Sequence, residues 1–369
     1  FRDEDARADR SPGEFYQLDF EMAYATQEDV FSVCERVLAE TFARFSKKEI
    51  SPPPFRRIPF AEAMLRYGTD KPDLRNPLMI FDLSTYFLDT DFAPFRGKTV
   101  RAIRVPGAAA QPRSFFRDME KYAVEEVGMK GLGYVTVQDD GTYKGPIDKF
   151  LSDEKKQALK DIAQAEGQPL AAGDVLYFIA DEPDAAPKYA GQIRTEAARR
   201  LGMMDENRFE FCFITDFPMY EYNEEQGKID FTHNPFSMPQ GEMDALQTKD
   251  PLDILAWQYD VVCNGVELSS GAVRNHRPDV MVKAFEIAGY SEKDVEEKFG
   301  ALYSAFSYGA PPHAGMAPGV DRMVMLLAGE ENIRETIAFP LNANAQNLML
   351  DAPSEVTEQQ LREVHIKLR

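Results

Sequence analysis

The stretch WQYDVVCNGVELSSGAVR, residues Trp257–Arg274, decides how the centre of the fold is built. Asn264-Gly265 is the strongest short hairpin signal, because a type I′ turn needs a positive φ at both central positions. Counting outward from this turn pairs Val262 with Glu267. The Ser-Ser-Gly that follows predicts a β-bulge in the second strand. We therefore expect two antiparallel strands here.

This hairpin predicts that two carboxylates, Asp260 and Glu267, share one face. Diagonal neighbours on such a face lie about 7–8 Å apart at Cα. Two carboxylates at that distance can bind Mg²⁺, a hard cation that takes oxygen ligands and keeps waters for phosphates. A pair of surface acids on an edge is the alternative, and the pattern leaves both open. Arg274 lies beyond the bulge, and its fork geometry would suit a carboxylate or phosphate in the same cleft.

A second strand pattern lies near the start of the chain, in EFYQLDFEMAY (14–24). Its alternation predicts a strand with one apolar face in the core. That face carries Tyr16, Leu18, Phe20, Met22 and Tyr24, and the opposite face carries Gln17, Asp19 and Glu21. Residues 1–4 also alternate, with Arg2 and Glu4 on one face, and segment 5–13 is expected to be the loop between the two strands. Such a polar face is either solvated or the floor of a site for a charged ligand.

A glycine-rich turn precedes an apolar helix in GMAPGVDRMVMLLAG (315–329), and Gly329 is expected to end this helix. Asp321 and Arg322 fall in the first helical turn, where an acid suits the helix dipole and an arginine works against it. Holding an anion would explain Arg322, and a side chain that snorkels from a core helix is the alternative. His233, in DFTHNPFSMP, is a loop residue that could contact a ligand. None of the four histidines lies at metal-ligand spacing to another.

Composition limits the classes of function. The chain has 369 residues, 62 acidic against 42 basic, and a net charge of −20. This charge argues against broad, nonspecific binding to DNA or membranes, but not against a nucleic acid held by a local basic surface. Three scattered cysteines indicate neither a zinc site nor a disulfide framework, so a reducing, cytoplasmic setting is expected. No apolar run is long enough to span a bilayer.

The order of elements predicts one domain split by another. A capping box at Thr26 starts a long amphipathic helix. Strand-like and helix-like segments alternate over 95–205, which indicates a separate α/β module. Two more helices are expected near 278–288 and 292–306. We expect a mixed antiparallel domain formed by 1–94 and 206–369, with this module inserted between its two parts.

These motifs together resemble those of a known family. FRDED…EFYQLDFE is similar to motif 2 of the class II aminoacyl-tRNA synthetases, and GMAPGVDRMVMLL is similar to their motif 3. YDVVCNGVELSSGAVR is similar to the stretch between them in the aspartate–asparagine–lysine subgroup. Three further features narrow the resemblance to bacterial-type aspartyl-tRNA synthetases, with the chain starting at motif 2. They are RYGTDKPDLRNP, the inserted module and THNPFSMP. The resemblance implies an α+β fold, a class II antiparallel sheet flanked by helices, with a GAD-like inserted α/β domain.

The resemblance implies ATP-dependent ligation of L-aspartate to tRNA through an aspartyl-adenylate. Arg2, Arg274 and Arg322 would be the catalytic residues: Arg2 on the α-phosphate, Arg322 on the γ-phosphate, and Arg274 on the side-chain carboxylate of aspartate. Asp260 and Glu267 would hold Mg²⁺. Arg7 and Arg10, in the 5–13 loop, would contact the acceptor end of the tRNA.

The implied binding residues form two sets. The residues expected to bind ATP are Arg2, Asp3, Glu4, Phe15, Glu267, Gly319, Val320, Asp321 and Arg322. The residues expected to bind aspartate are Arg2, Gln17, Asp19, His233 and Arg274.

Further expectations concern partners and alternatives. The family implies a cytoplasmic homodimer formed through a motif 1 that this chain does not contain, with no membrane partner. Charging of asparagine tRNA as well stays open. The alternatives are a synthetase-like amidoligase that adenylates aspartate and transfers it to ammonia, and an inactive truncated paralogue.

Overall fold

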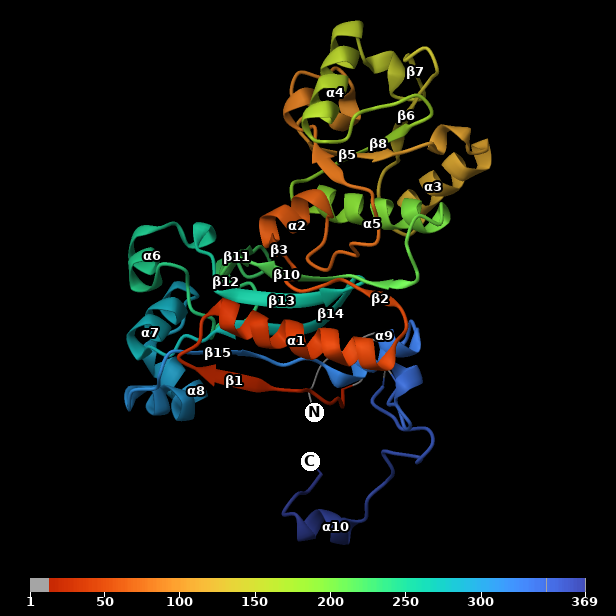
Figure 1. Cartoon of the computed structure of the whole chain (residues 1–369). Helices are drawn as coiled ribbons and strands as arrows, with labels where there is room; N and C mark the ends of the chain where they lie inside the picture. The colour runs from red at the N-terminus through yellow and green to blue at the C-terminus, as the bar shows by residue number, and fades with distance from the viewer. Residues whose placement is uncertain (1–12, 343, 369) are drawn as a thin grey trace.

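A computed structural model describes residues 13–342 and 344–368. A six-stranded sheet forms the centre of this part, in the order β1-β15-β14-β13-β10-β3 (Figure 1). All its neighbouring strands are antiparallel except β10 and β3. The predicted antiparallel sheet flanked by helices is therefore confirmed. Its strands are β1 (Phe20–Ala23), β3 (Arg56–Pro59), β10 (Phe211–Thr215), β13 (Gln258–Cys263), β14 (Val266–Val273) and β15 (His313–Met316).

The predicted hairpin is β13 and β14. Asn264 and Gly265 have φ values of 50° and 82°, and Val262 pairs with Glu267, as expected. The bulge falls at Leu268, just before the Ser-Ser-Gly, because Val261 pairs with Ser269. Leu268 is 1% exposed and belongs to the core, so burial of its side chain accounts for the extra residue at this position.

The predicted apolar face of the first described strand is only partly confirmed. Phe20 and Met22, in β1, pack against the core. Tyr16, Leu18 and Tyr24 are exposed, so the prediction that they face the core was wrong for the described chain. Among the described residues β1 is short and pairs with β15 alone, and Tyr16, Leu18 and Tyr24 lie outside it.

Helix α1 (Gln27–Phe45) covers one face of the six-stranded sheet (Figure 1). The predicted capping box at Thr26 is confirmed, with Asp29 as its partner. Phe31 of α1 stacks on Phe213 of β10 with ring centroids 3.8 Å apart. Because α1 fills this face, polar side chains that point away from it lie on the other face.

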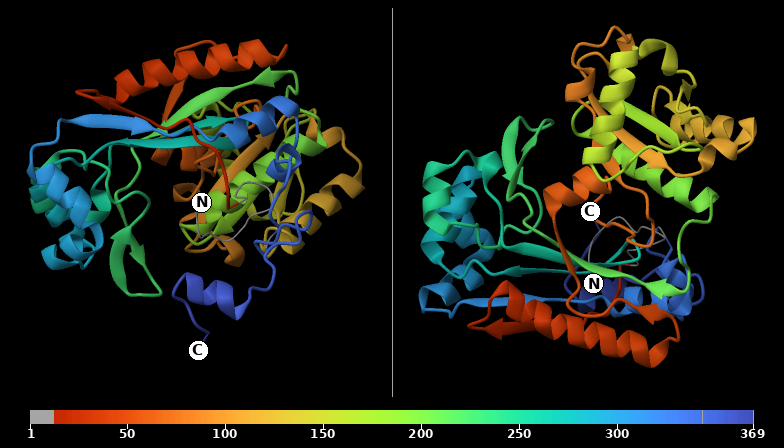
Figure 2. Two further views of the ribbon diagram at one scale, coloured as in Figure 1. Left: turned by 90° about the horizontal axis from the view of Figure 1, so that it is seen from below. Right: turned by 45° about the horizontal axis from the view of Figure 1, so that its top comes forward.

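The opposite face carries α2 (Phe60–Arg66) and, beyond it, a second sheet (Figure 2). Ala63 of α2 and the adjoining Tyr67 pack on Cys212, Ile214 and Val262. The second sheet has the order β4-β5-β8-β6-β7, and all its pairings are antiparallel. Its strands are β4 (Ile80–Asp82), β5 (Thr99–Val105), β6 (Gly133–Val137), β7 (Tyr143–Lys144) and β8 (Val175–Asp181).

Three helices complete what we call the five-stranded unit, the second sheet with α3 (Arg113–Glu125), α4 (Asp153–Ala165) and α5 (Ala185–Arg200). Helices α3 and α5 pack on one face of its sheet and α4 on the other. The helices and strands expected over 95–205 are therefore present. Strand β4 precedes residue 95, so the unit includes chain before the expected boundary, and the domain boundaries themselves stay predictions.

The remaining elements surround the central sheet. The helices expected near 278–288 and 292–306 are confirmed as α7 (Pro278–Ile287) and α8 (Glu292–Ser307). Gly329, with a φ of 75°, ends α9 (Val320–Ala328) as predicted. In the part of the chain that the structure describes, no helix is both long and apolar enough to cross a membrane. The others are β2 (Glu49–Ile50), β9 (Arg208–Phe209), β11 (Tyr220–Asn223), β12 (Lys228–Phe231), α6 (Glu242–Thr248) and α10 (Glu358–Glu363).

Candidate active site

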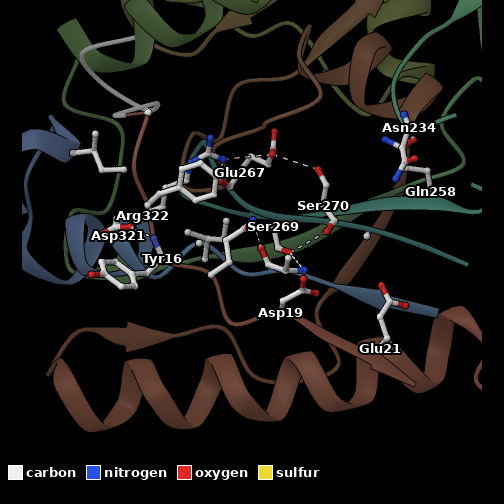
Figure 3. A pocket seen from close by; sticks show the side chains of 18 of the residues that line it. Tyr16, Asp19, Glu21, Asn234, Gln258, Glu267, Ser269, Ser270, Asp321 and Arg322 are labelled. Atoms are coloured by element: carbon white, nitrogen blue, oxygen red, sulfur yellow. Dashed lines mark hydrogen bonds and ion pairs between the residues drawn. The ribbon is translucent and has the colours of Figure 1, made fainter. Parts of the chain in front are cut away.

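A cleft of about 370 Å³ opens where β1, β14, β15 and the start of α9 meet. It brings together most of the described residues that sequence analysis placed in one site. Its lining also includes Glu21, Asn234, Gln258 and Ser270, which were not predicted as site residues (Figure 3). The predicted residues that line it are Phe15, Gln17, Asp19, Glu267, Arg274, Gly319, Asp321 and Arg322.

The segment before β1 is bound to the start of α9. The backbone N–H of Val320 donates to Tyr16 O at 2.8 Å. The backbone N–H of Tyr16 donates to Asp321 Oδ2, also at 2.8 Å. Gln17 and Gly319 form an isolated bridge beside these bonds. Asp321 therefore fixes the chain that leads into β1, while the next residue, Arg322, lines the cleft.

Glu267 lies at one end of the cleft, where several side chains contact it. Arg322 Nη1 donates to Glu267 O at 2.6 Å and lies 3.4 Å from Glu267 Oε1. Ser270 Oγ lies 3.3 Å from the same Oε1. Figure 3 shows Glu267 between Arg322 and Ser270. An arginine and a carboxylate thus share this end, a combination suited to phosphates with a cation.

Asp260, on the neighbouring strand β13, is 3% exposed. The bulge places Ser270 directly opposite Asp260, and the Ser270 hydroxyl donates to Asp260 Oδ1 at 2.6 Å. Burial, and then the charge of Glu267, raise the pKa of Asp260 to about 8. Asp260 and Glu267 are neighbouring carboxylates whose negative charges repel each other. We call them the acid pair, and a divalent cation would stabilise them.

The oxygen donors of this acid pair, Asp260 and Glu267, fit a hard cation such as Mg²⁺. Three or more clustered His, Cys, Asp or Glu side chains of the kind that form a closed metal site do not occur in the described residues. The acid pair would therefore supply only part of a coordination shell, and phosphate oxygens and water would complete it.

Lys71 reaches this acid pair from outside the hairpin. Its Nζ lies 3.2 Å from Glu267 Oε2, and it also pairs with Asp70. Burial lowers the pKa of Lys71, but the charges of Glu267 and Asp70 outweigh burial and raise it above its ordinary value. Sequence analysis missed Lys71 because nothing in RYGTDKPDLRNP shows that it approaches a distant strand.

Arg274 and Glu21 meet at the other end of the cleft. Arg274 donates to Glu21 Oε1 from Nε at 2.9 Å and from Nη2 at 2.5 Å. Glu21 lies across Gly315: a Cβ on that glycine would lie 2.6 Å from Glu21 Oε2 and 2.2 Å from Phe20 O. Glu21 shares the predicted polar face of Gln17 and Asp19, and that signal could have identified it.

Some predicted residues lie elsewhere. His233 lines a neighbouring cavity of about 750 Å³, with Asp70 and Lys71, rather than the cleft. Burial lowers the pKa of His233. The next residue, Asn234, lines the cleft, so the contact expected between His233 and the amino acid stays a prediction. Val320 contributes its backbone, as described above, and is not in the cleft lining. Arg2, Asp3, Glu4, Arg7 and Arg10 lie outside the described residues.

A family model and curated relatives point to the same family of proteins. Residues 1–343 match the family model of tRNA synthetases class II (D, K and N). The chain is 58% identical over 369 residues to the aspartate–tRNA ligase of Streptomyces coelicolor, covering 100% of this chain and 62% of that protein. It is 54% identical over 377 residues to the aspartate–tRNA(Asp/Asn) ligase of Rickettsia bellii, again covering 62% of that protein. The chain thus spans 62% of the length of these curated relatives.

Among solved structures, the aspartyl tRNA synthetase from Entamoeba histolytica aligns with a TM-score of 0.43 and 18% identity, over 94% of this chain and 47% of that one. This structural similarity is too low to support any assignment.

Proposed function

The chain belongs to the tRNA synthetases of class II (D, K and N), and from that premise we propose that it carries the catalytic region of an aspartate–tRNA ligase. The proposed reaction is the ATP-dependent ligation of L-aspartate to tRNA through an aspartyl-adenylate. The two curated relatives described above carry the name of this activity, and neither an amidoligase nor an inactive paralogue is favoured by them.

One observation carries the proposal: a single cleft holds two complementary ends. Arg274, the partner of Glu21, lines one end, where it can receive a carboxylate. Glu267 and Arg322 line the other end, away from Glu21, where they can receive a triphosphate (Figure 3). A reaction between a dicarboxylic amino acid and ATP needs such an arrangement, because the two substrates must meet in line within one pocket.

In the first step, an oxygen of the aspartate α-carboxylate attacks the α-phosphorus of ATP. A bond forms between these atoms as the bond to the leaving pyrophosphate breaks, which gives the mixed anhydride. In the second step, the terminal ribose hydroxyl of the tRNA attacks the aspartyl carbonyl, loses its proton, and releases AMP. Positioning and charge stabilisation supply most of the rate in such transfers.

The proposed roles of the chain's own residues follow the two ends of the cleft. Arg322 would bind the γ-phosphate, and Phe15 would stack on the adenine, with Arg2, Asp3 and Glu4 completing the ATP site. Asp260 and Glu267 would hold Mg²⁺, which supplies positive charge against the phosphates when bound. The remaining ATP contacts would come from the start of α9, at Gly319, Val320 and Asp321.

Arg274 would select aspartate. Glu21 accepts from its Nε and Nη2, and within the described part of the chain its Nη1 makes no hydrogen bond. A substrate carboxylate can accept from Nη1 with either oxygen and brings the negative charge that suits a guanidinium. Asparagine has one amide oxygen and no charge, and a site built for a carboxylate can reject a neutral analogue by about 10⁴–10⁵. Gln17, Asp19 and His233 would bind the ammonium and cover the amino acid.

Other parts of the proposal concern partners. Arg7 and Arg10 would contact the acceptor end of the tRNA, and the protein would work as a cytoplasmic homodimer. The five-stranded unit would correspond to the inserted GAD-like domain. The Rickettsia relative is named for both aspartate and asparagine tRNAs. The proposal therefore covers an enzyme that charges aspartate tRNA alone and one that also charges asparagine tRNA.

The test is exchange of labelled pyrophosphate into ATP by the full-length gene product. Exchange should require aspartate and fail with asparagine. Exchange that does not depend on aspartate, or that is equal with asparagine, would overturn the proposal.

A further inference from the structure

Glu267 has a cation at each carboxylate oxygen. Arg322 Nη1 lies 3.4 Å from Oε1, and Lys71 Nζ lies 3.2 Å from Oε2. The Lys71 and Glu267 side chains are only 26% and 23% exposed, so solvent screens this pair less than an ordinary surface pair. Lys71 thus restrains the rotation of a carboxylate that Arg322 and Ser270 contact from the other side.

The segment that carries Lys71 is held by α5 of the five-stranded unit. Just before Lys71, the backbone of Gly68 touches the backbone of Gly191 in α5. A Cβ on Gly68 would lie 2.5 Å from Gly191 N, and a Cβ on Gly191 would lie 2.6 Å from Gly68 O. Neither position has room for a side chain, so this contact fixes the chain on the N-terminal side of Lys71.

Arg194, one turn further along α5, fixes the chain on the C-terminal side. It is 1% exposed, and it donates to Leu78 O at 2.6 Å and to Asn76 O at 2.8 Å. Asn76 Nδ2 donates back to Arg194 O at 3.2 Å. Among the described residues Arg194 has no carboxylate partner, so this buried guanidinium is committed to the backbone of the segment that follows Lys71.

We propose that Lys71 is a positioning residue of the ATP site, and that α5 of the five-stranded unit fixes it there. This inference rests on the proposed function and adds a role for the five-stranded unit. Lys71 holds Glu267 in the orientation that serves the ATP end of the cleft. The aspartate end, at Arg274, has its own partner in Glu21 and does not depend on Lys71. Loss of Lys71 therefore weakens ATP binding selectively.

The first experiment uses Lys71→Met, Lys71→Arg and the control Lys121→Met in the full-length gene product. Lys121 pairs with Glu125 on the exposed surface of α3, so the control removes an ion pair far from the cleft. The measurements are the separate KM values for ATP and aspartate in pyrophosphate exchange, and the Kd for ATP by equilibrium dialysis without aspartate. The midpoint of thermal unfolding reports any general loss of structure.

Lys71→Met should raise the KM and the Kd for ATP about tenfold or more, the effect of losing one charge-assisted hydrogen bond. The KM for aspartate should stay within about twofold, Lys71→Arg should recover most of the ATP affinity, and Lys121→Met should behave as wild type. Unchanged ATP binding in Lys71→Met, or equal changes in both KM values, would overturn the inference. A wild-type protein without aspartate-dependent exchange would contradict the proposed function instead, and the Kd for ATP would still test Lys71.

The second experiment tests whether α5 acts through Lys71. Gly191→Ala should raise the KM for ATP in the wild-type background and have no further effect in the Lys71→Met background. Gly300→Ala is the control, because a Cβ there would meet nothing within 4 Å. If Gly191→Ala fails to fold, Asn76→Ala removes the bond to Arg194 O without adding bulk and gives the same test. Equal effects in both backgrounds, or no effect of either variant, would show that α5 does not position Lys71.

Discussion

Arg274 and Glu21 are joined by two hydrogen bonds that end on one oxygen, Glu21 Oε1, with lengths of 2.9 Å from Nε and 2.5 Å from Nη2. Glu21 belongs to β1 and Arg274 directly follows β14. Strand β15 lies between β1 and β14 in the sheet, and its Gly315 leaves space for the Glu21 side chain. This arrangement holds the guanidinium still before a substrate arrives. A preorganised donor of this kind contributes more to discrimination than a mobile one, because its ordering cost is met during folding.

The first prediction concerns the arginine of this pair. Arg274→Leu should lower kcat/KM for aspartate by roughly 3–5 kcal/mol, because it leaves the substrate carboxylate and Glu21 without a cation. The measurement is aspartate-dependent pyrophosphate exchange. Arg277→Leu, at an exposed arginine that pairs with Glu242 and Asp279, is the control and should be nearly neutral. A near-normal kcat/KM in Arg274→Leu would contradict the role given to Arg274.

The second prediction concerns the space beneath Glu21. A Cβ on Gly315 would lie 2.2 Å from Phe20 O and 2.5 Å from Glu21 Cδ, so Gly315→Ala must displace β1 or Glu21. We expect a loss of about 1–3 kcal/mol in the free energy of unfolding. The KM for aspartate should also rise more than the KM for ATP. Gly300→Ala serves as the control for the substitution itself, and a change in neither KM value would show that Glu21 does not position Arg274.

The third prediction is a pH dependence that arises at Asp260. Its folded pKa, about 8, lies above the ordinary value of 3.8, so the folded chain keeps a proton that the unfolded chain releases. The contribution of this group to stability is therefore complete below about pH 4 and is lost as the pH rises towards 8. Asparagine cannot titrate, and its amide oxygen can still accept from Ser270.

The measurement for Asp260 is thermal unfolding of the ligand-free protein in a chelator, from pH 5 to pH 8. The midpoint of Asp260→Asn should rise relative to wild type across this range, while exchange activity is lost. Asp253→Asn, at an exposed aspartate, is the control. A difference between Asp260→Asn and wild type that does not change with pH would contradict the account.

The fourth prediction concerns the buried guanidinium of α5. Arg194→Met should cost about 3 kcal/mol or more of unfolding free energy, because the carbonyls of Leu78 and Asn76 lose their donors in a buried setting. Denaturant unfolding measures this loss, and Arg36→Met, on the exposed side of α1, is the control. A loss as small as that of the control would show that water can replace the guanidinium.

Local signals accounted for much of the fold. The Asn264-Gly265 turn, the Thr26 capping box and the Gly329 helix end were predicted because each depends on residues adjacent in sequence. The alternation before β1 was less informative. It shows which side chains share a face, but burial depends on what packs against that face, and Tyr16 and Leu18 are exposed in the described chain.

Contacts across the chain limited what could be predicted for the site. The acid pair was found because both carboxylates belong to one hairpin, but the bulge at Leu268 decided that Ser270 lies opposite Asp260. The pairing of Arg274 with Glu21 joins residues 253 positions apart. The position proposed for Lys71 depends on the packing of α5 against the loop that carries Lys71. No local pattern in that loop encodes this packing.

The central claim is that this chain belongs to an enzyme that ligates aspartate to tRNA. The most direct measurement is aminoacylation of purified tRNA with labelled aspartate by the full-length gene product. We predict ATP-dependent formation of aspartyl-tRNA that falls sharply in Arg274→Leu, whether or not asparagine tRNA is also charged. Absence of aspartyl-tRNA under conditions where a known aspartate–tRNA ligase is active, or its formation without ATP, would contradict the claim.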